Sequence, residues 1–153
     1  MKIGLSGKMV SGKSVVAAHL VSKYGFTEYS FAKRLKELAV ELFGVKHKDE
    51  RGRLIMQQLA ERLREIDPNV WVRYLLDRLP PDGDIVIGDV RYVNEFTSLR
   101  ERGFFLVRMV QERAEQERLI CLTYPGLPLT LLDDKSEIAL DEYERRFKFN
   151  YYI

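Results

Sequence analysis

The pattern of apolar and polar positions divides the chain into short strands and longer helices. Apolar runs rich in β-branched and aromatic residues predict strands, whereas apolar residues that recur every three or four positions predict helices. The predicted strands cover residues 2–6, 26–30, 85–88, 104–110 and 147–153. The predicted helices cover residues 15–23, 31–43, 51–66, 94–102, 111–122 and 137–146, with one more beginning at Asp67-Pro68. Strands that alternate with helices indicate an α/β fold with a parallel sheet and helices on both faces.

Several of these elements have recognisable boundaries. Gly44 and Gly103 follow predicted helices, at the position where glycine commonly ends a helix. Asp67 is placed to cap the next helix, with Pro68 at its first position. The run at residues 85–88 has no polar alternation, as expected of a parallel strand that is covered on both faces.

Length, composition and charge indicate one globular domain. The 153 residues are 46% hydrophobic and 31% charged, which is typical of a folded protein. No run approaches the roughly 20 apolar residues of a membrane span, and there is no signal-peptide pattern, so we expect a cytoplasmic protein without a membrane partner. The net charge of +2 gives no electrostatic reason to expect nucleic acid as a partner. Cys121 is the only cysteine, which excludes an internal disulfide.

The segment at residues 7–14 fits the phosphate-loop pattern G-x-x-x-x-G-K-[ST], between a predicted strand and a predicted helix. Gly7 and Gly12 permit a tight loop whose amides point at phosphate oxygens, Lys13 reaches the β and γ phosphates, and the Ser14 hydroxyl can ligate Mg²⁺. The alternative is a structural glycine turn. The residues expected to bind ATP are Gly7, Lys8, Met9, Val10, Ser11, Gly12, Lys13, Ser14 and Val15.

Asp89 and Arg91 follow the apolar run at residues 85–88. The carboxyl ends of parallel strands meet at one edge of a sheet, so Asp89 is expected beside the phosphate loop, where it can hold Mg²⁺ through water or accept a bond from Ser14. A guanidinium at Arg91 can bond two phosphate oxygens at once. The competing interpretation is that Asp89 and Arg91 pair with each other at the end of a strand.

A phosphate loop serves several classes of protein, and other features of the chain favour a small kinase. The chain is too short for an ATPase with a separate lid domain, and it has no NKxD-like guanine-specificity motif. A kinase also needs a second anion pocket for the acceptor, an acid near the metal, and arginines that neutralise charge during transfer.

The sequence resembles the phage-type deoxynucleoside monophosphate kinases, a family of P-loop nucleoside monophosphate kinases. The resemblance rests on blocks at residues 4–14, 31–36, 55–59, 64–71, 88–95 and 136–137, in the family's order. It implies a five-stranded parallel sheet of order 2-3-1-4-5, ATP on the phosphate loop, and one kinase domain over residues 1–153. An acceptor-binding helical region is expected at about residues 31–80 and a lid at about residues 111–128.

The resemblance also implies the acceptor and lid residues. Candidates for binding the acceptor nucleotide are Lys36, Arg53, Arg64, Trp71, Arg91 and Glu95. Trp71 would stack on the base or line the pocket, and Glu95 would orient Arg91 or contact the sugar. Arg113 and Arg118 are candidates for lid arginines that reach the transferring phosphate. The alternatives are solvated basic residues on amphipathic helices for Lys36 and Arg53, a core position for Trp71, and surface salt bridges for Arg113 and Arg118.

The chain departs from the family pattern at three places. Ala60 stands where glycine is frequent, and Lys135 stands where a histidine is usual. The sequence stops at Tyr151-Tyr-Ile153, where relatives continue into a loop that helps to cover the adenine. Either the donor base is more exposed here, or a homo-oligomer covers it.

These observations favour ATP- and Mg²⁺-dependent phosphorylation of a nucleoside monophosphate, with a deoxynucleotide as the expected acceptor. Lys13, Asp89, Arg91, Arg113 and Arg118 are the expected catalytic residues, and Ser14 and Asp89 are the expected metal ligands. Two alternatives stay open. One is another small metabolite kinase, such as one acting on dephospho-coenzyme A, and the other is a nucleotide-gated binding protein without catalysis.

Overall fold

The structure is a computed structural model that describes residues 1–45, 50–146 and 148–153. Over these residues the chain forms two compact units by its internal contacts. The sheet unit comprises residues 1–28 and 82–153, and the helical unit comprises residues 29–81. Within the described ranges, no helix combines the length and the apolar content that crossing a bilayer requires.

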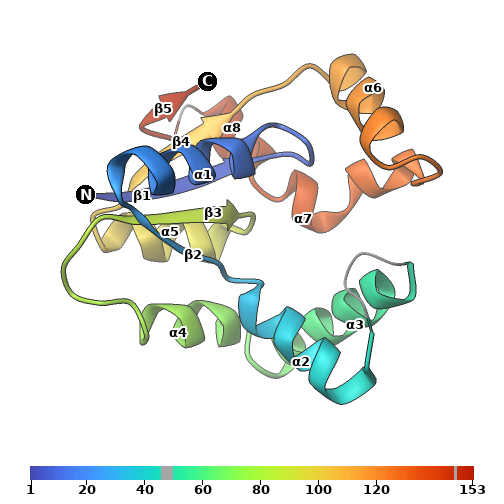
Figure 1. The fold of residues 1–153 in the computed structure, drawn as a ribbon, viewed down its shortest axis with the longest axis horizontal. Helices are drawn as coiled ribbons and strands as arrows, with labels where there is room; N and C mark the ends of the chain where they lie inside the picture. Colours follow the sequence, from blue (N-terminus) through green and yellow to red (C-terminus); the bar gives the residue numbers. More distant parts are fainter. Residues whose placement is uncertain (46–49, 147) are drawn as a thin grey trace. The chain divides into compact units, whose positions relative to one another are not determined.

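Five strands form one sheet in the order β2-β3-β1-β4-β5, as predicted (Figure 1). The strands are β1 (Lys2–Gly7), β2 (Thr27–Tyr29), β3 (Ile85–Val90), β4 (Phe105–Met109) and β5 (Tyr151–Tyr152). β1 pairs in parallel with β3 and with β4, and β4 pairs in parallel with β5. The carboxyl ends of β1 and β3 therefore meet at one edge, which is where an α/β sheet usually binds its ligand.

The helix α1 (Lys13–Tyr24) lies on one face of the sheet, and α5 (Val93–Glu101) lies on the other (Figure 1). Ala17 of α1 packs with Leu5 and Val86 in a buried cluster. On the opposite face, a side chain at Gly4 would come within 2.6 Å of Leu106 and 3.3 Å of Leu99, so glycine permits the close packing there. The central strands are thus covered on both faces, as the unbroken apolar run of β3 predicts.

Further helices of the sheet unit follow β4. They are α6 (Arg113–Thr123), the 3-10 helix η1 (Leu129–Asp133), α7 (Lys135–Ile138) and α8 (Asp141–Arg145). The prediction of one helix over residues 137–146 is wrong, because Leu140 is buried and has a backbone (φ −105°, ψ 7°) that departs from helical geometry. Asp134 starts α7 earlier than predicted by accepting a hydrogen bond from the backbone N–H of Ser136 at 2.8 Å.

The boundaries of β3 and β5 also differ from the prediction. Asp89 lies within β3 rather than beyond it. β5 is shorter than the predicted strand at residues 147–153, of which Phe147 lies outside the described residues. Asn150 already bonds to Leu106 of β4 before β5 begins, through its backbone N–H and its side-chain oxygen.

The helical unit contains α2 (Lys33–Phe43), α3 (Glu50–Ile66) and α4 (Val70–Leu76). Gly44 ends α2 in the left-handed conformation (φ 61°), as predicted. Asp67 was expected to cap α4 with Pro68 at its first position, but the helix begins later and its cap is Asn69. The side chain of Asp67 instead accepts a bond from the Asn69 N–H at 2.9 Å, so it stabilises the turn that leads into the helix.

Candidate functional site

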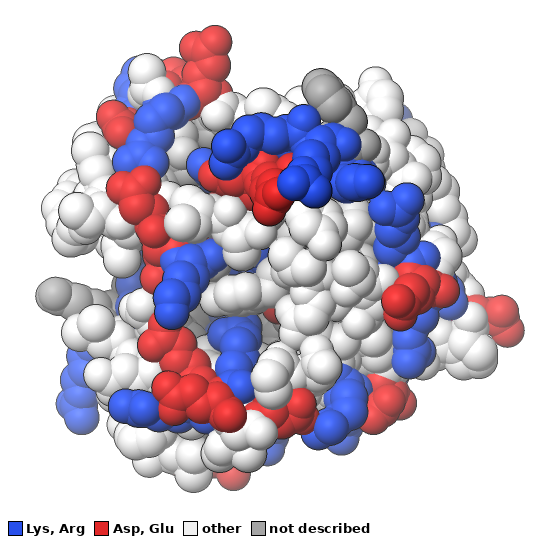
Figure 2. Space-filling view, turned by 180° about the vertical axis from the view of Figure 1, so that it is seen from behind, with Lys and Arg blue, Asp and Glu red and all other residues white. Residues whose placement is uncertain are grey.

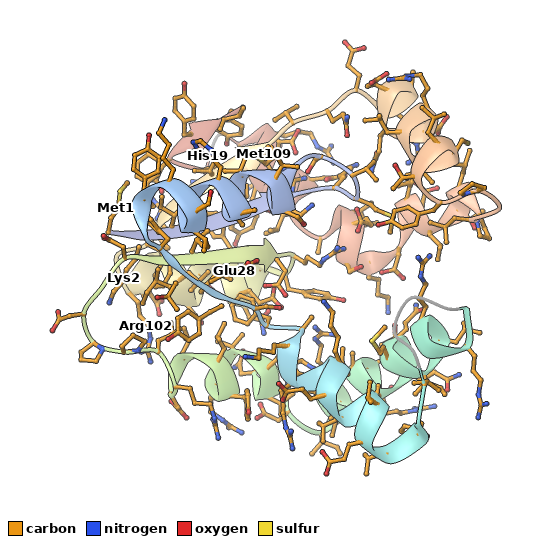
Figure 3. The ribbon with its side chains drawn as sticks, viewed as in Figure 1. Met1, Lys2, His19, Glu28, Arg102 and Met109 are labelled. Carbon is orange, nitrogen blue, oxygen red and sulfur yellow. The ribbon has the colours of Figure 1, made fainter. Side chains whose placement is uncertain are left out.

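The phosphate-loop segment forms a tight turn between β1 and α1. Gly7 (φ 149°) and Gly12 (φ 88°) have positive φ, which favours glycine. A side chain at Gly7 would lie 2.8 Å from the carbonyl oxygen of Met109, the residue labelled at the end of β4 in Figure 3. Val10 also has positive φ (57°), which is a strained conformation for a β-branched residue. The loop is therefore held in a specific shape at some cost in backbone energy.

Lys13 begins α1 and folds back into the loop. Its ammonium donates hydrogen bonds to the carbonyl oxygens of Gly7 at 2.7 Å and Lys8 at 2.6 Å, and to Ser11 Oγ at 3.3 Å. The residue is only 9% exposed. Burial lowers the pKa of Lys13 to about 8, and the positive charge of Arg91 adds to the effect, whereas the negative charge of Glu137 partly offsets it.

Arg91 follows directly after β3 and forms an ion pair with Glu137 of α7 through Nη1 and Oε1. Its side chain is about a third exposed, whereas that of Glu137 is almost fully buried. This ion pair was not predicted from the sequence, whose competing interpretation paired Arg91 with Asp89. Asp89 is half-buried near the end of β3, and its negative charge also acts on Lys13.

Glu95 is buried in the first turn of α5 and holds the backbone that follows β3. Its Oε2 accepts hydrogen bonds from the N–H groups of Arg91 at 2.8 Å and Tyr92 at 3.0 Å. A carboxylate in this position satisfies donors that the start of a helix leaves without intrahelical partners. Glu95 thus fixes the main chain of Arg91, while Glu137 holds its side chain.

Glu137 is the site residue that the sequence reasoning missed. Besides the Arg91 pair, its Oε2 accepts a hydrogen bond at 2.6 Å from the N–H of Met9 in the phosphate loop. One signal points to it, because Ser136-Glu137 is part of the family resemblance. An acidic residue in a short, charged segment would otherwise be expected on the surface. Only the fold brings Glu137 into contact with the phosphate loop.

Gln116 of α6 binds the carbonyl group of the same residue, Met9. Its Nε2 donates a hydrogen bond to the carbonyl oxygen of Met9 at 3.1 Å, and the residue is fully buried. Met9 is therefore clamped through its N–H by α7 and through its C=O by α6. Nothing in the Gln/Glu/Arg-rich run that forms α6 distinguishes Gln116 by residue type alone.

A second group of charges fixes the start of the loop to β4. Lys8 forms an ion pair with Asp141 at 3.1 Å, and Asp141 also accepts a bond from Arg108 at 3.0 Å. Arg108 is almost fully buried and donates to Ser6 Oγ at 3.0 Å as well as to Glu144. These contacts explain how a buried arginine is tolerated in a central strand.

Arg113 and Arg118, the two lid candidates, lie on the surface of α6. Arg113 pairs with Glu117 at 2.6 Å and with Asp133 at 3.0 Å. Arg118 pairs with Glu115 at 2.7 Å. Both side chains are largely exposed, as in a solvated helix with charges at salt-bridge spacing.

The acceptor candidates Lys36, Arg53, Arg64 and Trp71 all belong to the helical unit. Lys36 is exposed on α2, and Arg53 and Arg64 are half-buried on α3. Trp71 is buried at 4% exposure in α4, and among the described residues its indole N–H has no hydrogen-bond partner. A buried donor in this state costs roughly 1–3 kcal/mol, so Trp71 has an N–H that a ligand or water could satisfy.

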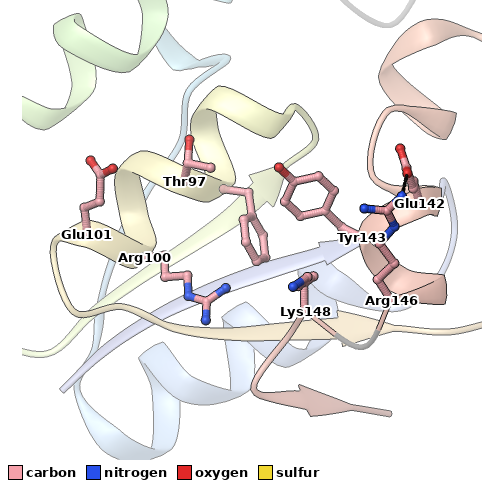
Figure 4. Close-up of a pocket in the computed structure, with 8 residues that line it drawn as sticks. Thr97, Arg100, Glu101, Glu142, Tyr143, Arg146 and Lys148 are labelled. Carbon is pink, nitrogen blue, oxygen red and sulfur yellow. Dashed lines mark ion pairs between the residues drawn. The ribbon is translucent and has the colours of Figure 1, made fainter.

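The surface has a hollow that is separate from the predicted site residues. This hollow in the sheet unit is lined by Thr97 and Arg100 of α5, Tyr143 of α8 and Lys148 (Figure 4). It contains none of the predicted site residues. On the face seen in Figure 2, basic and acidic side chains are interspersed, in line with the nearly balanced charge of the sequence.

The oxygen atoms near the loop suit Mg²⁺. Ser14 is exposed in the first turn of α1, and Asp89 supplies a carboxylate at the end of β3. Mg²⁺ in phosphate-transfer sites is commonly held by one or two protein oxygens together with phosphate oxygens and water. Among the described residues, no group of three or more His, Cys, Asp or Glu is placed to hold a metal ion.

Comparison with known proteins supports the reading of the fold. No protein-family model matches the chain. A protein of Acanthamoeba polyphaga mimivirus named "Putative deoxynucleotide monophosphate kinase" is 29% identical over 140 residues, covering 70% of this chain and 72% of that protein. TT1252 from Thermus thermophilus, a solved structure, has a TM-score of 0.62 at 23% identity, covering 99% of this chain and 86% of that chain. The first confirms the resemblance that the motifs predict, and the second confirms the fold.

Proposed function

We propose that this protein is a nucleotide kinase that transfers the γ-phosphoryl group of ATP to a nucleoside monophosphate, with deoxynucleotides as the preferred acceptors. The observation that carries the proposal is the phosphate loop before α1, with buried Lys13 inside it and Arg91 linked to it through Glu137. The mimivirus relative supports the same class of reaction.

The donor would bind along the phosphate loop. Backbone N–H groups of the phosphate loop, apart from that of Met9, which Glu137 holds, and the N-terminus of α1 would supply partial positive charge for the phosphates. Lys13 donates to loop carbonyls when no phosphate is present, and the same ammonium can turn to the β and γ phosphates. Ser14 and Asp89 would hold Mg²⁺, which would supply positive charge for the reaction.

Each unit contributes its own candidates for acceptor binding, with Arg91 in the sheet unit. Arg91 uses Nη1 for Glu137, and its other N–H groups can bond an acceptor phosphate. Lys36, Arg53 and Arg64 are the proposed cations of the helical unit, and Trp71 is its proposed base contact. Arg113 and Arg118 would act as lid arginines only after leaving the carboxylates that hold them in this structure.

In the proposed reaction an oxygen of the acceptor's 5′-phosphate forms a bond to the γ-phosphorus of ATP. The bond between that phosphorus and the β–γ bridging oxygen breaks, and its electron pair stays on the leaving ADP. Because the second pKa of a phosphate monoester is about 6, the attacking oxygen is largely deprotonated at neutral pH and needs no general base. Catalysis therefore rests on positioning and charge stabilisation.

A panel of ribo- and deoxynucleoside monophosphates tests the proposal, with ATP and Mg²⁺ as donor and product formation as the readout. Dephospho-coenzyme A belongs in the panel as the acceptor of the alternative kinase. We expect at least one deoxynucleotide to be phosphorylated, and Lys13→Ala to lose both ATP binding and turnover. Lys23→Ala is the matched control, because Lys23 lies exposed at the other end of α1.

The outcomes separate the candidate functions. Phosphorylation of dephospho-coenzyme A alone would support the other metabolite kinase. ATP binding that depends on Lys13, with no acceptor phosphorylated, would contradict the kinase proposal and support a nucleotide-gated binding protein.

A further inference from the structure

Glu137 lies at the junction of the phosphate loop and Arg91. One oxygen of its carboxylate, Oε2, accepts the Met9 N–H at 2.6 Å, and the other, Oε1, pairs with Arg91 Nη1. Its side chain is only 2% exposed, so water does not compete for these contacts to any large extent. A buried carboxylate with two such partners is costly to replace, because removing its charge leaves Arg91 without compensation.

The helix that carries Glu137 is itself fixed at its start. The side chain of Asp134 accepts bonds from the backbone N–H of Ser136 at 2.8 Å and from its hydroxyl at 2.7 Å. This capping fixes the start of the short helix α7, and Glu137 of that helix contacts the phosphate loop. Its two partners come from the loop after β1 and from the end of β3, so one side chain connects segments far apart in the sequence.

The contact with Met9 also affects the shape of the loop. Met9 precedes Val10, the non-glycine residue with positive φ, and its peptide groups are held by Glu137 on one side and Gln116 on the other. A strained conformation persists only where the surroundings determine it. Glu137 therefore contributes both to the loop conformation and to the direction of the Arg91 side chain.

We propose that Glu137 is a positioning residue, which holds the Arg91 guanidinium at a fixed place relative to the phosphate loop. The inference rests on the proposed function, since it assigns to Arg91 the task of neutralising phosphate charge during transfer. Glu137 needs no contact with substrate for this role. With Nη1 occupied by Glu137, the remaining N–H groups of Arg91 keep a constant orientation toward an incoming phosphate.

A double-mutant cycle of Glu137→Gln and Arg91→Ala tests this role. Glutamine keeps the size and an acceptor for the Met9 N–H, but it removes the charge that holds Arg91. We expect Glu137→Gln to lower kcat by about 10- to 100-fold with the KM for ATP changed less than about threefold. The double variant should be no slower than Arg91→Ala alone, because Glu137 acts through Arg91. Effects that multiply would overturn the proposal.

Glu142→Gln is the control, since Glu142 is an exposed glutamate of α8 whose carboxylate pairs with Arg146. It should leave kcat nearly unchanged. If Glu137→Gln does not fold, Glu137→Asp replaces it in the cycle. Aspartate keeps the charge but is shorter by one methylene, and we expect a smaller loss of kcat that again disappears in the Arg91→Ala background.

A measurement that needs no turnover separates this proposal from the proposed function. In the wild-type protein, the ¹⁵N resonances of the Arg91 guanidinium should show restricted rotation and slow exchange with water. Both properties should be lost in Glu137→Gln and kept in Glu142→Gln. If the panel shows no kinase activity but the Arg91 signals respond as expected, the proposed function fails while the positioning role stands. Signals that do not respond to Glu137→Gln contradict the positioning role, whatever the activity.

Discussion

The sheet unit and the helical unit hold their candidate site residues in different ways. In the sheet unit, Lys13 and Glu137 are buried and bonded to the phosphate loop. In the helical unit, the candidate Lys36 is exposed on the surface of α2. The arrangement in the sheet unit is formed before any ligand arrives, whereas an exposed lysine keeps most of its rotamer freedom until a ligand orders it.

This difference has an energetic consequence. Groups that are already oriented lose little entropy on binding and can act on the transition state, so their removal should reduce kcat. Groups that are ordered only by the substrate contribute mainly to binding, so their removal should raise KM. Substitutions in the sheet unit should therefore mainly lower kcat, whereas substitutions in the helical unit should mainly raise KM and have smaller effects.

Arg91→Ala should give the largest effect among substitutions outside the phosphate loop. We expect kcat to fall by about 100-fold or more, with the Kd for ATP largely retained, because the guanidinium stabilises charge on the transferring phosphate. Arg113→Ala is the comparison, since Arg113 is exposed and already paired with Glu117 and Asp133. Steady-state kinetics and calorimetry of ATP binding measure both. Equal losses of activity and stability in Arg91→Ala would instead indicate a structural ion pair.

The pH dependence of stability should reveal the burial of Lys13. Burial, and next the charge of Arg91, lower its pKa to about 8, whereas a lysine in the unfolded chain titrates near 10.4. Below pH 8, Lys13 is protonated in both the folded and the unfolded chain, and the full cost of burying its charge lowers the stability. Between pH 8 and about 10.4 the unfolded chain binds more protons, so stability should rise with pH, by up to about 3 kcal/mol.

Lys13→Met isolates this contribution from other groups that titrate in the same range. The unfolding free energy of the wild type should increase relative to that of Lys13→Met as the pH rises from 7 to 10. Urea denaturation at several pH values measures it. A difference that is constant with pH would mean that Lys13 has an ordinary pKa, and hence that the loop does not bury it.

Arg64→Ala tests the helical unit and should have a smaller effect. We expect the KM for the nucleoside monophosphate to rise about tenfold, with kcat changed little, because the side chain would contribute to acceptor binding. Arg62→Ala is the control on the same helix, since Arg62 is 77% exposed and pairs with Glu65. Initial rates at varied acceptor concentration distinguish the two. A loss of kcat in Arg64→Ala would show that the helical unit, too, acts on the transition state.

The parts of the site that the sequence predicts are those fixed by local chemistry. Gly7, Gly12 and Lys13 follow the spacing that a phosphate loop requires, and the apolar run before Asp89 marks a central strand. Glu137 and Gln116 could not be assigned in the same way, because their roles depend on contacts with Met9 across 128 and 107 positions of the chain. Residue type and spacing carry information about neighbours along the chain. The buried partner of a distant residue depends on the fold.

The Asp67-Pro68 boundary failed for a related reason. Both residues are favoured at the start of a helix, but the carboxylate of Asp67 bonds to Asn69 within a turn, and the helix starts after it. The local preferences of Asp67 and Pro68 correctly indicate that a helix begins nearby. The side-chain hydrogen bond of Asp67 determines the residue at which it begins.

Val10→Gly should have the smallest effect and addresses the cost of the preformed loop. Positive φ at valine costs roughly 1–2 kcal/mol, and glycine relieves it but loses about 0.5–1 kcal/mol through the greater freedom of the unfolded chain. We therefore expect stability to rise by at most about 1 kcal/mol, measured by thermal unfolding. If ATP affinity falls in the same variant, valine restricts the loop to its binding shape. If affinity is unchanged, the clamp on Met9 by Glu137 and Gln116 is sufficient to maintain that shape.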